Sequence, residues 1–395
     1  MAVNKLDISM MEDVGTSASQ LLQRDGSGNI PAVDGSQLTG ITEFTTSTSD
    51  PVVTTNPSDG VGSLWYNKTD GEMYVCTDAT AGANVWTNIG AGTGNIEPIP
   101  IWQGDQYGYC AGGKGDDAPL TNRIERWSFT SDSNSVDVGD LTQDIMEAAG
   151  ASSYTHGYHA GGQYPAPVPY TTDIEKWSFA SATTNAAVIG DRFGIGQCVG
   201  HSSSTHGYAS SDGNGPAPSN TTIDKWTFAA DNDATDVGGL SVPRYGVCGT
   251  SSATHGYTCG GHAVSYNYIE KFSFTTDGNA VDIANLTDGM YQASGSGSET
   301  HGYAAGGVSG WPTVLNKINK FPYATDSDAT DWADLTVAKY GHRGTASTTY
   351  AYHMGGENGV NEQNVIEKNS FASQSNATDV GDLTQLVDQT TACSY

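Results

Sequence analysis

The residues with the clearest capacity for chemistry are four histidines that recur in one short phrase, Thr-His-Gly-Tyr, as His156, His206, His255 and His301. Imidazole nitrogens are common zinc ligands, so equivalent histidines gathered around one axis could form a metal site. Two further copies of the phrase carry tyrosine at that position, Tyr107 and Tyr350, which would interrupt such a shell. We therefore expect the histidines to pack and to form hydrogen bonds, and we expect no metal site.

Two acidic turns have the carboxylate spacing of a calcium loop. They read DNDATD and DSDATD and contain Asp231, Asp233, Asp236, Asp326, Asp328 and Asp331. Both lack the glycine and the terminal glutamate of the twelve-residue calcium-binding pattern. Because aspartate commonly caps the backbone of its own turn, we expect these residues to stabilise hairpins.

The sequence contains no motif typical of catalysis: no nucleophile elbow, no phosphate-binding loop and no HExxH. We therefore expect a protein that is not an enzyme, with no catalytic residues and no cofactor. Its 44 acidic residues nevertheless offer many carboxylate pairs of the kind that hydrolyse glycosides. A polysaccharide-degrading propeller enzyme therefore stays an alternative.

Composition and charge indicate the class of protein. The 395 residues carry 16 Lys and Arg against 44 Asp and Glu, a net charge of -28, which argues against a nucleic-acid partner. The 50 glycines and 20 tyrosines suit an all-β protein with tight turns. The six cysteines form no CxxC pair, which favours buried thiols. Asp7, Glu12 and Asp13 interrupt the N-terminal stretch, so we expect no signal peptide and no membrane insertion.

A repeat of about 49 residues must position all of these side chains, and it runs from residue 99 to the C-terminus. After each Thr-His-Gly-Tyr phrase comes a second phrase that reads IERWSF, IEKWSF, IDKWTF, IEKFSF, INKFPY or IEKNSF. A polar turn and a segment similar to DVGDL follow this second phrase in the sequence. Each of the six copies contains about four short strand candidates and no helical apolar period. The sequence therefore predicts a six-bladed β-propeller, residues 99-395.

The second phrase and the chain end fit this interpretation. Strand alternation places Trp177 and Ile174 on opposite faces, as a sheet packed between two neighbours requires. The first copy lacks the strand that precedes the histidine phrase in later copies, and the ending TTACSY, residues 390–395, matches that strand. We expect the C-terminal strand to complete the first blade and to close the ring.

A pair of glycines follows the histidine phrase in five of the six copies, beginning at Gly112, Gly161, Gly260, Gly306 and Gly355. The order of strand, Gly pair, variable loop, aromatic strand, polar turn and fourth strand resembles the kelch repeat. The kelch tryptophan of the fourth strand has a counterpart only at Trp332. The resemblance therefore implies a kelch-like propeller rather than a standard kelch domain.

The first hundred residues have a different pattern. Residues 42-98 contain strand candidates around a turn at Asp70-Gly71, which predicts a small β-hairpin module. Residues 1-41 alternate turn signals with apolar patches too small to form a core. We expect this extended N-terminal anchor to gain order from a partner.

Two N-terminal segments, residues 30–41 and 62–72, resemble the amino-terminal parts of bacteriophage tail fibres and other virion appendage proteins. The repeats are similar to those of predicted structural proteins of marine phages. The resemblance implies synthesis in the host cytoplasm, attachment to other virion tail proteins through residues 1-41, and a homotrimer whose propeller is displayed for host attachment. A head decoration or fibre protein is the alternative within the virion, and a cellular kelch-type scaffold ranks last.

The copies differ most between the Gly pair and the aromatic strand. Blade symmetry would bring these loops to one face, where they would present Tyr164, Tyr170, Tyr266, Tyr268 and Trp311. Rigid aromatic surface with polar neighbours is typical of protein and carbohydrate recognition. We expect this face to bind a bacterial surface glycan or protein. The equally weighted alternative is that the loops vary because nothing constrains them.

Overall fold

The computed structural model of the chain describes residues 44–89, 102–115, 120–164, 170–181, 183–194, 196–213, 221–262 and 267–395. The predicted anchor, residues 1-41, lies outside them. The chain divides into two compact units, Met1–Pro98 and Ile99–Tyr395. The described residues form strands and no helix, so the expected all-β class is confirmed. Accordingly, no described helix is long and apolar enough to cross a membrane.

The first unit contains one four-stranded sheet in the order β1 (Phe44–Ser47), β2 (Leu64–Asn67), β3 (Met73–Asp78) and β4 (Val85–Asn88). The predicted hairpin is confirmed, because β2 pairs antiparallel with β3 across the Asp70-Gly71 turn. Asp70 Oδ1 accepts a hydrogen bond from Glu72 N at 3.0 Å, and Gly71 has a φ of 84° that favours glycine. The core of the first unit consists of Tyr74, Cys76 and Trp86.

The second unit contains six four-stranded antiparallel sheets, numbered here in chain order. Sheet 1 has β28 (Thr391–Ser394), β5 (Tyr107–Ala111), β6 (Arg123–Ser128) and β7 (Val136–Asp140). Sheet 2 has β8 (Ala149–Ser152), β9 (His156–Ala160), β10 (Asp173–Ser178) and β11 (Ala187–Asp191). Sheet 3 has β12 (Gln197–Ser202), β13 (His206–Gly213), β14 (Thr222–Thr227) and β15 (Thr235–Gly239). Sheet 4 has β16 (Cys248–Ser251), β17 (His255–Cys259), β18 (Tyr268–Ser273) and β19 (Val281–Asn285). Sheet 5 has β20 (Ser294–Gly297), β21 (His301–Ala305), β22 (Lys317–Pro322) and β23 (Thr330–Asp334). Sheet 6 has β24 (Arg343–Ala346), β25 (Tyr350–Met354), β26 (Val365–Ser370) and β27 (Thr378–Asp382).

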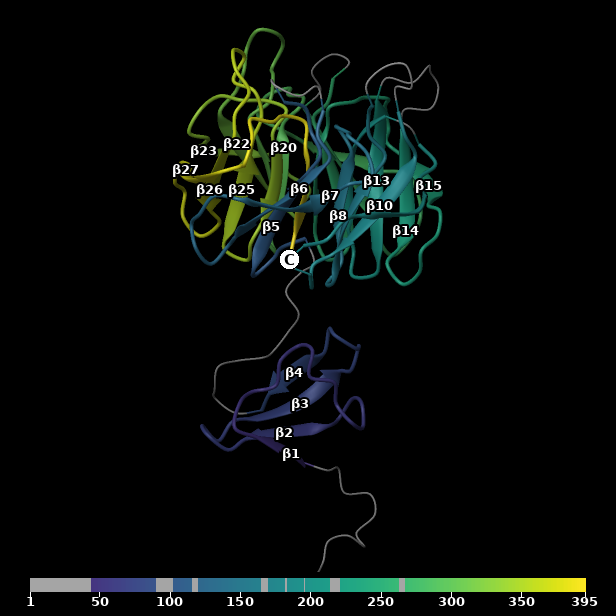
Figure 1. The fold of residues 1–395 in the computed structure, drawn as a ribbon, viewed down its shortest axis with the longest axis vertical. Coiled ribbons are helices and arrows are strands. Elements are labelled where there is room, and N and C mark those ends of the chain that lie inside the picture. The colour runs from purple at the N-terminus through teal and green to yellow at the C-terminus, as the bar shows by residue number, and fades with distance from the viewer. Residues whose placement is uncertain are drawn as a thin grey trace, which may run out of the picture. The chain divides into compact units, whose positions relative to one another are not determined.

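The C-terminal strand belongs to the first sheet, as the sequence predicts. β28 pairs antiparallel with β5, with Thr391 opposite Ala111 and Ser394 opposite Gly108. The first strands of successive sheets contact one another in the order β8, β12, β16, β20, β24 and β28, and β28 in turn contacts β8. Figure 1 shows the C-terminus at one end of these sheets, where β5 begins.

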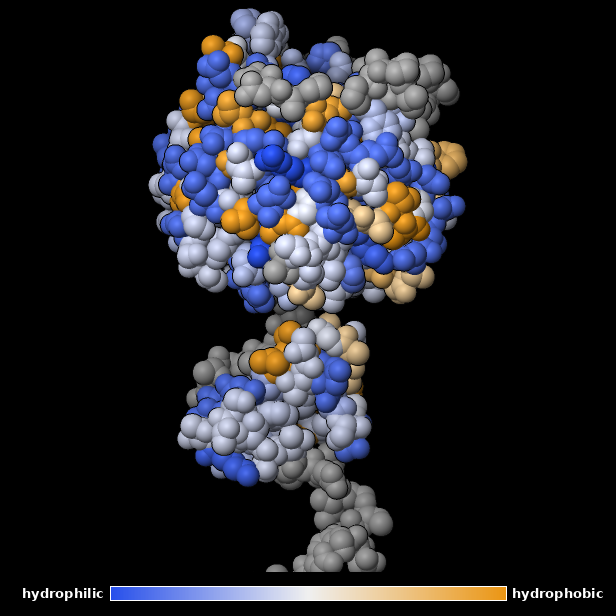
Figure 2. Space-filling view, viewed as in Figure 1, coloured by the Kyte–Doolittle hydropathy of each residue, from blue (hydrophilic) through white to orange (hydrophobic). Residues whose placement is uncertain are grey.

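Each sheet is packed on both faces. Ile174 of β10 lies in an apolar cluster with Trp226 and Ala209 of sheet 3. Trp177 of the same strand lies in a cluster with Tyr109 of sheet 1. The predicted placement of these two side chains on opposite faces is therefore confirmed. On the surface in view in Figure 2, apolar residues form small separate groups among hydrophilic ones.

The two repeated phrases fit together across the strand pair. Gly157 of β9 lies opposite Trp177 of β10, and a Cβ atom at Gly157 would lie 2.4 Å from the indole ring. Four other sheets repeat this pairing, as Gly108 with Trp127, Gly207 with Trp226, Gly256 with Phe272, and Gly302 with Phe321. Sheet 6 instead pairs Ala351 with Asn369. The glycine therefore makes room for the aromatic ring, and alanine stands there where the ring is missing.

All six cysteines are buried and are free thiols, and the prediction of buried cysteines is confirmed.

Candidate functional site

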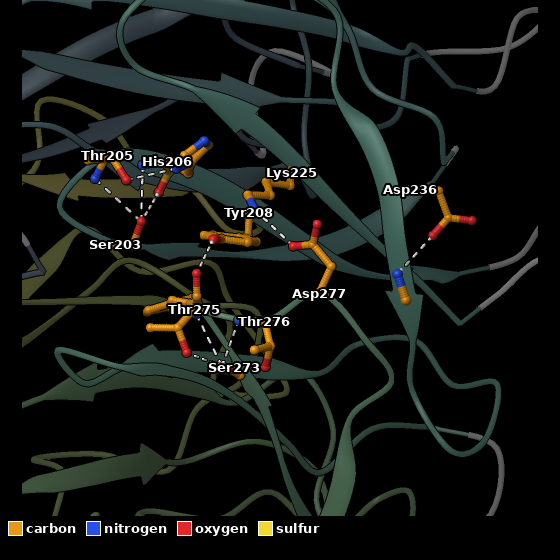
Figure 3. Close-up of polar contacts among 12 residues, drawn as sticks. Ser203, Thr205, His206, Tyr208, Lys225, Asp236, Ser273, Thr275, Thr276 and Asp277 are labelled. Atoms are coloured by element: carbon orange, nitrogen blue, oxygen red, sulfur yellow. Dashed lines mark hydrogen bonds and ion pairs between the residues drawn. The ribbon is translucent and has the colours of Figure 1, made fainter.

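The repeated histidines close the turns between the first and second strands. In sheet 3, Ser203 Oγ accepts hydrogen bonds from the backbone nitrogens of Thr205 at 3.4 Å and His206 at 3.0 Å (Figure 3). Thr205 Oγ1 lies 2.8 Å from His206 Nδ1. Partial burial and the nearby Lys225 ammonium lower the pKa of His206. The expected packing and hydrogen-bonding role is confirmed.

The other three histidines make the same contact. Thr155, Thr254 and Thr300 place their hydroxyl oxygens 2.8 Å from the adjoining His Nδ1 atoms. In the part of the chain that the structure describes, no group of three or more His, Cys, Asp or Glu side chains could hold a metal ion.

The acidic turns bind mainly to the preceding sheet. Asp233 Oδ1 accepts a hydrogen bond from Asp191 N at 3.0 Å, and Asp328 Oδ1 accepts one from Asn285 N at 2.9 Å. Asp236 Oδ1 accepts a hydrogen bond from Gly238 N of its own segment at 3.2 Å, so the predicted capping holds for Asp236 and not for Asp233 or Asp328 (Figure 3). Lys225 Nζ of sheet 3 lies 2.9 Å from Asp277 of sheet 4. Three other sheet boundaries have an equivalent ion pair, Lys176 with Asp231, Lys271 with Asp326, and Lys368 with Asp132. Because the aspartates are exposed, each pair contributes only about 0–1 kcal/mol of stability.

A buried acid or amide in the third strand of every sheet holds the preceding sheet. Glu175 Oε2 of β10 accepts a hydrogen bond from Thr142 N, just after β7, at 3.0 Å. The equivalent acceptors and donors are Glu125 with Thr384, Asp224 with Gly194, Glu270 with Ser241, Asn319 with Thr287, and Glu367 with Thr336, at 2.7 to 3.0 Å. We call these six contacts the clasps. Their carboxylates are committed to structure, which leaves them poorly suited to acid–base catalysis.

Three clasp acids also meet a buried cation. Arg192 Nε lies 2.9 Å from Asp224, Arg244 Nη2 lies 2.5 Å from Glu270, and Lys339 Nζ lies 2.6 Å from Glu367. Both partners in each pair are almost fully buried. Removing one partner of such a pair would leave an uncompensated buried charge, so we infer that these residues stabilise the fold.

The connections between second and third strands, and those that lead to the next sheet, lie at the end of the unit opposite the histidine turns. We call this the loop end. Trp311 lies there with 64% of its surface exposed. Tyr164 packs against the core cluster that contains Ile145, and half-buried Tyr268 stands in β18 beside the Arg244 guanidinium. Tyr170 is half-buried and bridges to Gln163, and Tyr266 lies outside the described residues. The described members come from three sheets and form no single cluster.

The structure adds aromatic residues that sequence reasoning missed. Tyr340 meets Trp311 edge-on, with ring centroids 6.0 Å apart. His262 lies between Tyr245 and Tyr291, with centroid distances of 4.9 and 4.7 Å. The three tyrosines stand in the connections between sheets, in the phrases RYG, MYQ and KYG. An alignment of these connections would have revealed them.

The centre of the loop end is narrow. Glu147, Gln292 and Gln389 have φ values of 61°, 53° and 56°, where the repeat elsewhere has Gly246 or Gly341. Their backbones form a chain of hydrogen bonds, including Gln389 N to Gly341 O at 2.6 Å and Glu147 N to Gln389 O at 2.9 Å. Cavities of about 70 and 60 Å³ lie among the first strands, room for a few water molecules only. These cavities are too small for a larger ligand. A pocket of about 330 Å³ lies at the opposite end of the unit, beside the turns of His255 and Thr300.

One buried carboxyl group at the loop end, that of Asp388, has a raised pKa. Asp388 is fully buried, and its Oδ2 accepts a hydrogen bond from Gln389 Nε2 at 2.9 Å. Its Oδ1 has no hydrogen-bond partner among the described residues. Burial raises the pKa of Asp388 to about 7, against the opposing effect of the Lys114 ammonium. The Glu362 carboxylate raises the pKa further.

Replacing Asp388 by Asn is expected to stabilise the protein at alkaline pH. With a folded pKa near 7 and an ordinary value of 3.8, the folded state binds the extra proton between these values, so wild-type stability falls as pH rises through this window. The D388N variant removes that loss. We expect it to be more stable than the wild type by on the order of 4 kcal/mol above pH 7, and almost equally stable below pH 4. Melting temperatures of both proteins from pH 4 to 8 measure this, and two parallel curves would contradict it.

Comparison with protein-family models finds no matching family, and comparison with curated proteins finds no similar protein.

Proposed function

We propose that this chain is a phage virion structural protein, a tail fibre or appendage. Residues 1-41 attach it to other virion proteins, and residues 99-395 form a six-bladed kelch-like β-propeller that recognises the host surface. Six equivalent sheets, the cyclic contacts of their first strands and the six clasps support the propeller interpretation.

The virion assignment rests on the resemblance of residues 30–41 and 62–72 to phage appendage proteins. The resemblance also supports a homotrimer and assembly in the host cytoplasm. The use of the repeated acids in clasps and turns agrees with a role in binding rather than in catalysis.

The observation that carries host recognition is the exposure of Trp311 at the loop end. A tryptophan with 64% of its surface in water contributes little to the core, but it offers a large rigid contact surface to a partner. The histidine turns, the C-terminus and the four exposed lysine–aspartate pairs described above lie at the other end of the unit.

Deleting residues 1-41 is expected to abolish incorporation into particles and to leave a folded protein that still adsorbs to host cells. The reason is that attachment and recognition are assigned to different segments. Particles assembled with wild-type or truncated protein are compared by immunoblot, and adsorption of each purified protein is measured on cells.

Two results would count against this function. A truncated chain that still enters particles would remove the attachment role of residues 1-41. A full-length chain that adsorbs to no bacterium permissive for the phage would remove the recognition role, and labelling of heads instead of tails would favour the decoration protein.

A further inference from the structure

We propose that Trp311 and the adjoining loop of sheet 6, residues 357–362 between β25 and β26, form a subsite for an uncharged glycan. This inference rests on the proposed function, which leaves open both the ligand and the residues that bind it. Its basis is one exposed indole, the turn that holds it, and the carboxylates beside it.

The indole of Trp311 is exposed but held in place. Its loop is a tight turn in which Thr313 N donates to Gly310 O at 3.0 Å and Ser309 N donates to Thr313 O at 3.0 Å. Tyr340, which is buried, supports the indole edge-on. An aromatic plane that is already fixed loses little conformational entropy when a ligand stacks on it.

The loop of sheet 6 lies against this turn. A Cβ atom at Gly359 would be 3.6 Å from Val314 Cγ2, so the two loops are in contact. Val360, next to Gly359, is 81% exposed, and Asn358 fixes the loop by accepting hydrogen bonds from Val360 N at 3.0 Å and Asn361 N at 2.9 Å. Two rigid apolar tips, Trp311 and Val360, therefore stand on neighbouring loops.

Carboxylates line the same loops. Burial and the nearby Glu357 carboxylate raise the pKa of the Tyr340 hydroxyl. The backbones of Tyr340 and Glu357 pair, and Glu357 also bridges to Glu362. Lys114 Nζ lies 3.4 Å from Glu362 Oε1. The Lys114 ammonium that these contacts bring to the subsite therefore already faces a carboxylate.

This chemistry selects among glycans. The apolar face of a sugar ring can stack on the indole, and carboxylate oxygens accept hydrogen bonds from sugar hydroxyls. An acidic sugar would meet Glu357 in a chain whose net charge is -28, and like charges in contact disfavour binding. The subsite therefore fits an uncharged hexose-type glycan and disfavours uronic, sialic or phosphorylated ones.

The test uses the full chain and surface polysaccharide from bacteria to which it adsorbs, separated by anion exchange into uncharged and acidic fractions. We expect binding to the uncharged fraction. Trp311→Ala should weaken this binding by about thirty-fold or more, the usual loss for an aromatic hot spot. Trp311→Phe, which keeps an aromatic face, should retain most of the affinity.

Phe193→Ala is the matched control, because Phe193 is 66% exposed and lies far from Trp311 in sequence, in the connection between sheets 2 and 3. It should bind like wild type. Three results would overturn the subsite: binding to the acidic fraction alone, binding to neither fraction, or equal losses of affinity for the Trp311 and Phe193 variants. Adsorption of the chain to cells would still support the proposed function in each case. A chain that adsorbs to no bacterium would remove both proposals.

Discussion

Removal of residues 390–395 is expected to lower the free energy of unfolding of the 99-395 unit by roughly 5 kcal/mol or more. The deletion takes the pairing of β28 with β5, the buried Cys393, and the Tyr395 ring that stacks on Phe179 at a centroid distance of 5.0 Å. It also breaks the hydrogen bond from Ser394 N to Ser152 Oγ at 3.1 Å. Calorimetry of the full and truncated chains measures the difference, and the exposed edge of β5 should promote aggregation.

A transplanted strand is the control for this deletion. The segment TTACS, placed before β5 through the turn that joins β8 to β9, would supply the same edge from the other end of the chain. This variant should recover most of the lost stability. Equal melting temperatures for the truncated and intact chains would show that β28 does not hold the sheets together.

Gly157→Ala is expected to cost about 3 kcal/mol, although alanine normally suits a strand better than glycine. A Cβ atom would lie 2.4 Å from the Trp177 ring, which is itself buried. In a background that carries Trp177→Asn, the same Gly157→Ala change should cost almost nothing. Urea unfolding of the four proteins gives the coupling energy of the pair.

Sheet 6 offers the reverse experiment, because it has Ala351 opposite Asn369. Asn369→Trp should destabilise the wild-type chain and should be relieved by adding Ala351→Gly. This second double-mutant cycle, of Asn369 and Ala351, provides the coupling energy if the Trp177→Asn variant is too unstable for urea unfolding to be measured. Additive effects in both cycles would show that the glycine and the aromatic ring are independent.

The sequence predicted the strands well because the repeat reports each of them six times. The histidine phrase, the aromatic phrase and the polar turn mark the second strand, the third strand and the turn after it, and the C-terminal segment could be matched to the missing first strand of sheet 1. The opposite orientation of Ile174 and Trp177 followed from strand alternation alone.

Other features depend on contacts that no local pattern records. The parallel pairing of β1 with β2 joins segments that carry no shared motif. The clasp of Glu175 needs Thr142 of another sheet, so a strand pattern shows only that a carboxylate recurs. Tyr164 looked like a surface residue because its loop varies, yet its ring packs against the core. Tyr340 could not be predicted from the two repeated phrases, because it lies in a connection between sheets, where the copies share little more than a tyrosine.

The pairing of β28 with β5 also affects the order of folding. Ala111 and its partner Thr391 are far apart in sequence, so β5 is synthesised long before β28. Contacts this distant in sequence form late, and domains generally fold from the N-terminal side as they are synthesised. Sheet 1 therefore keeps one edge open until β28 has been synthesised. A chain that stops before Thr391 leaves the edge of β5 exposed, so the pairing of β28 decides when this sheet is protected from association with other chains.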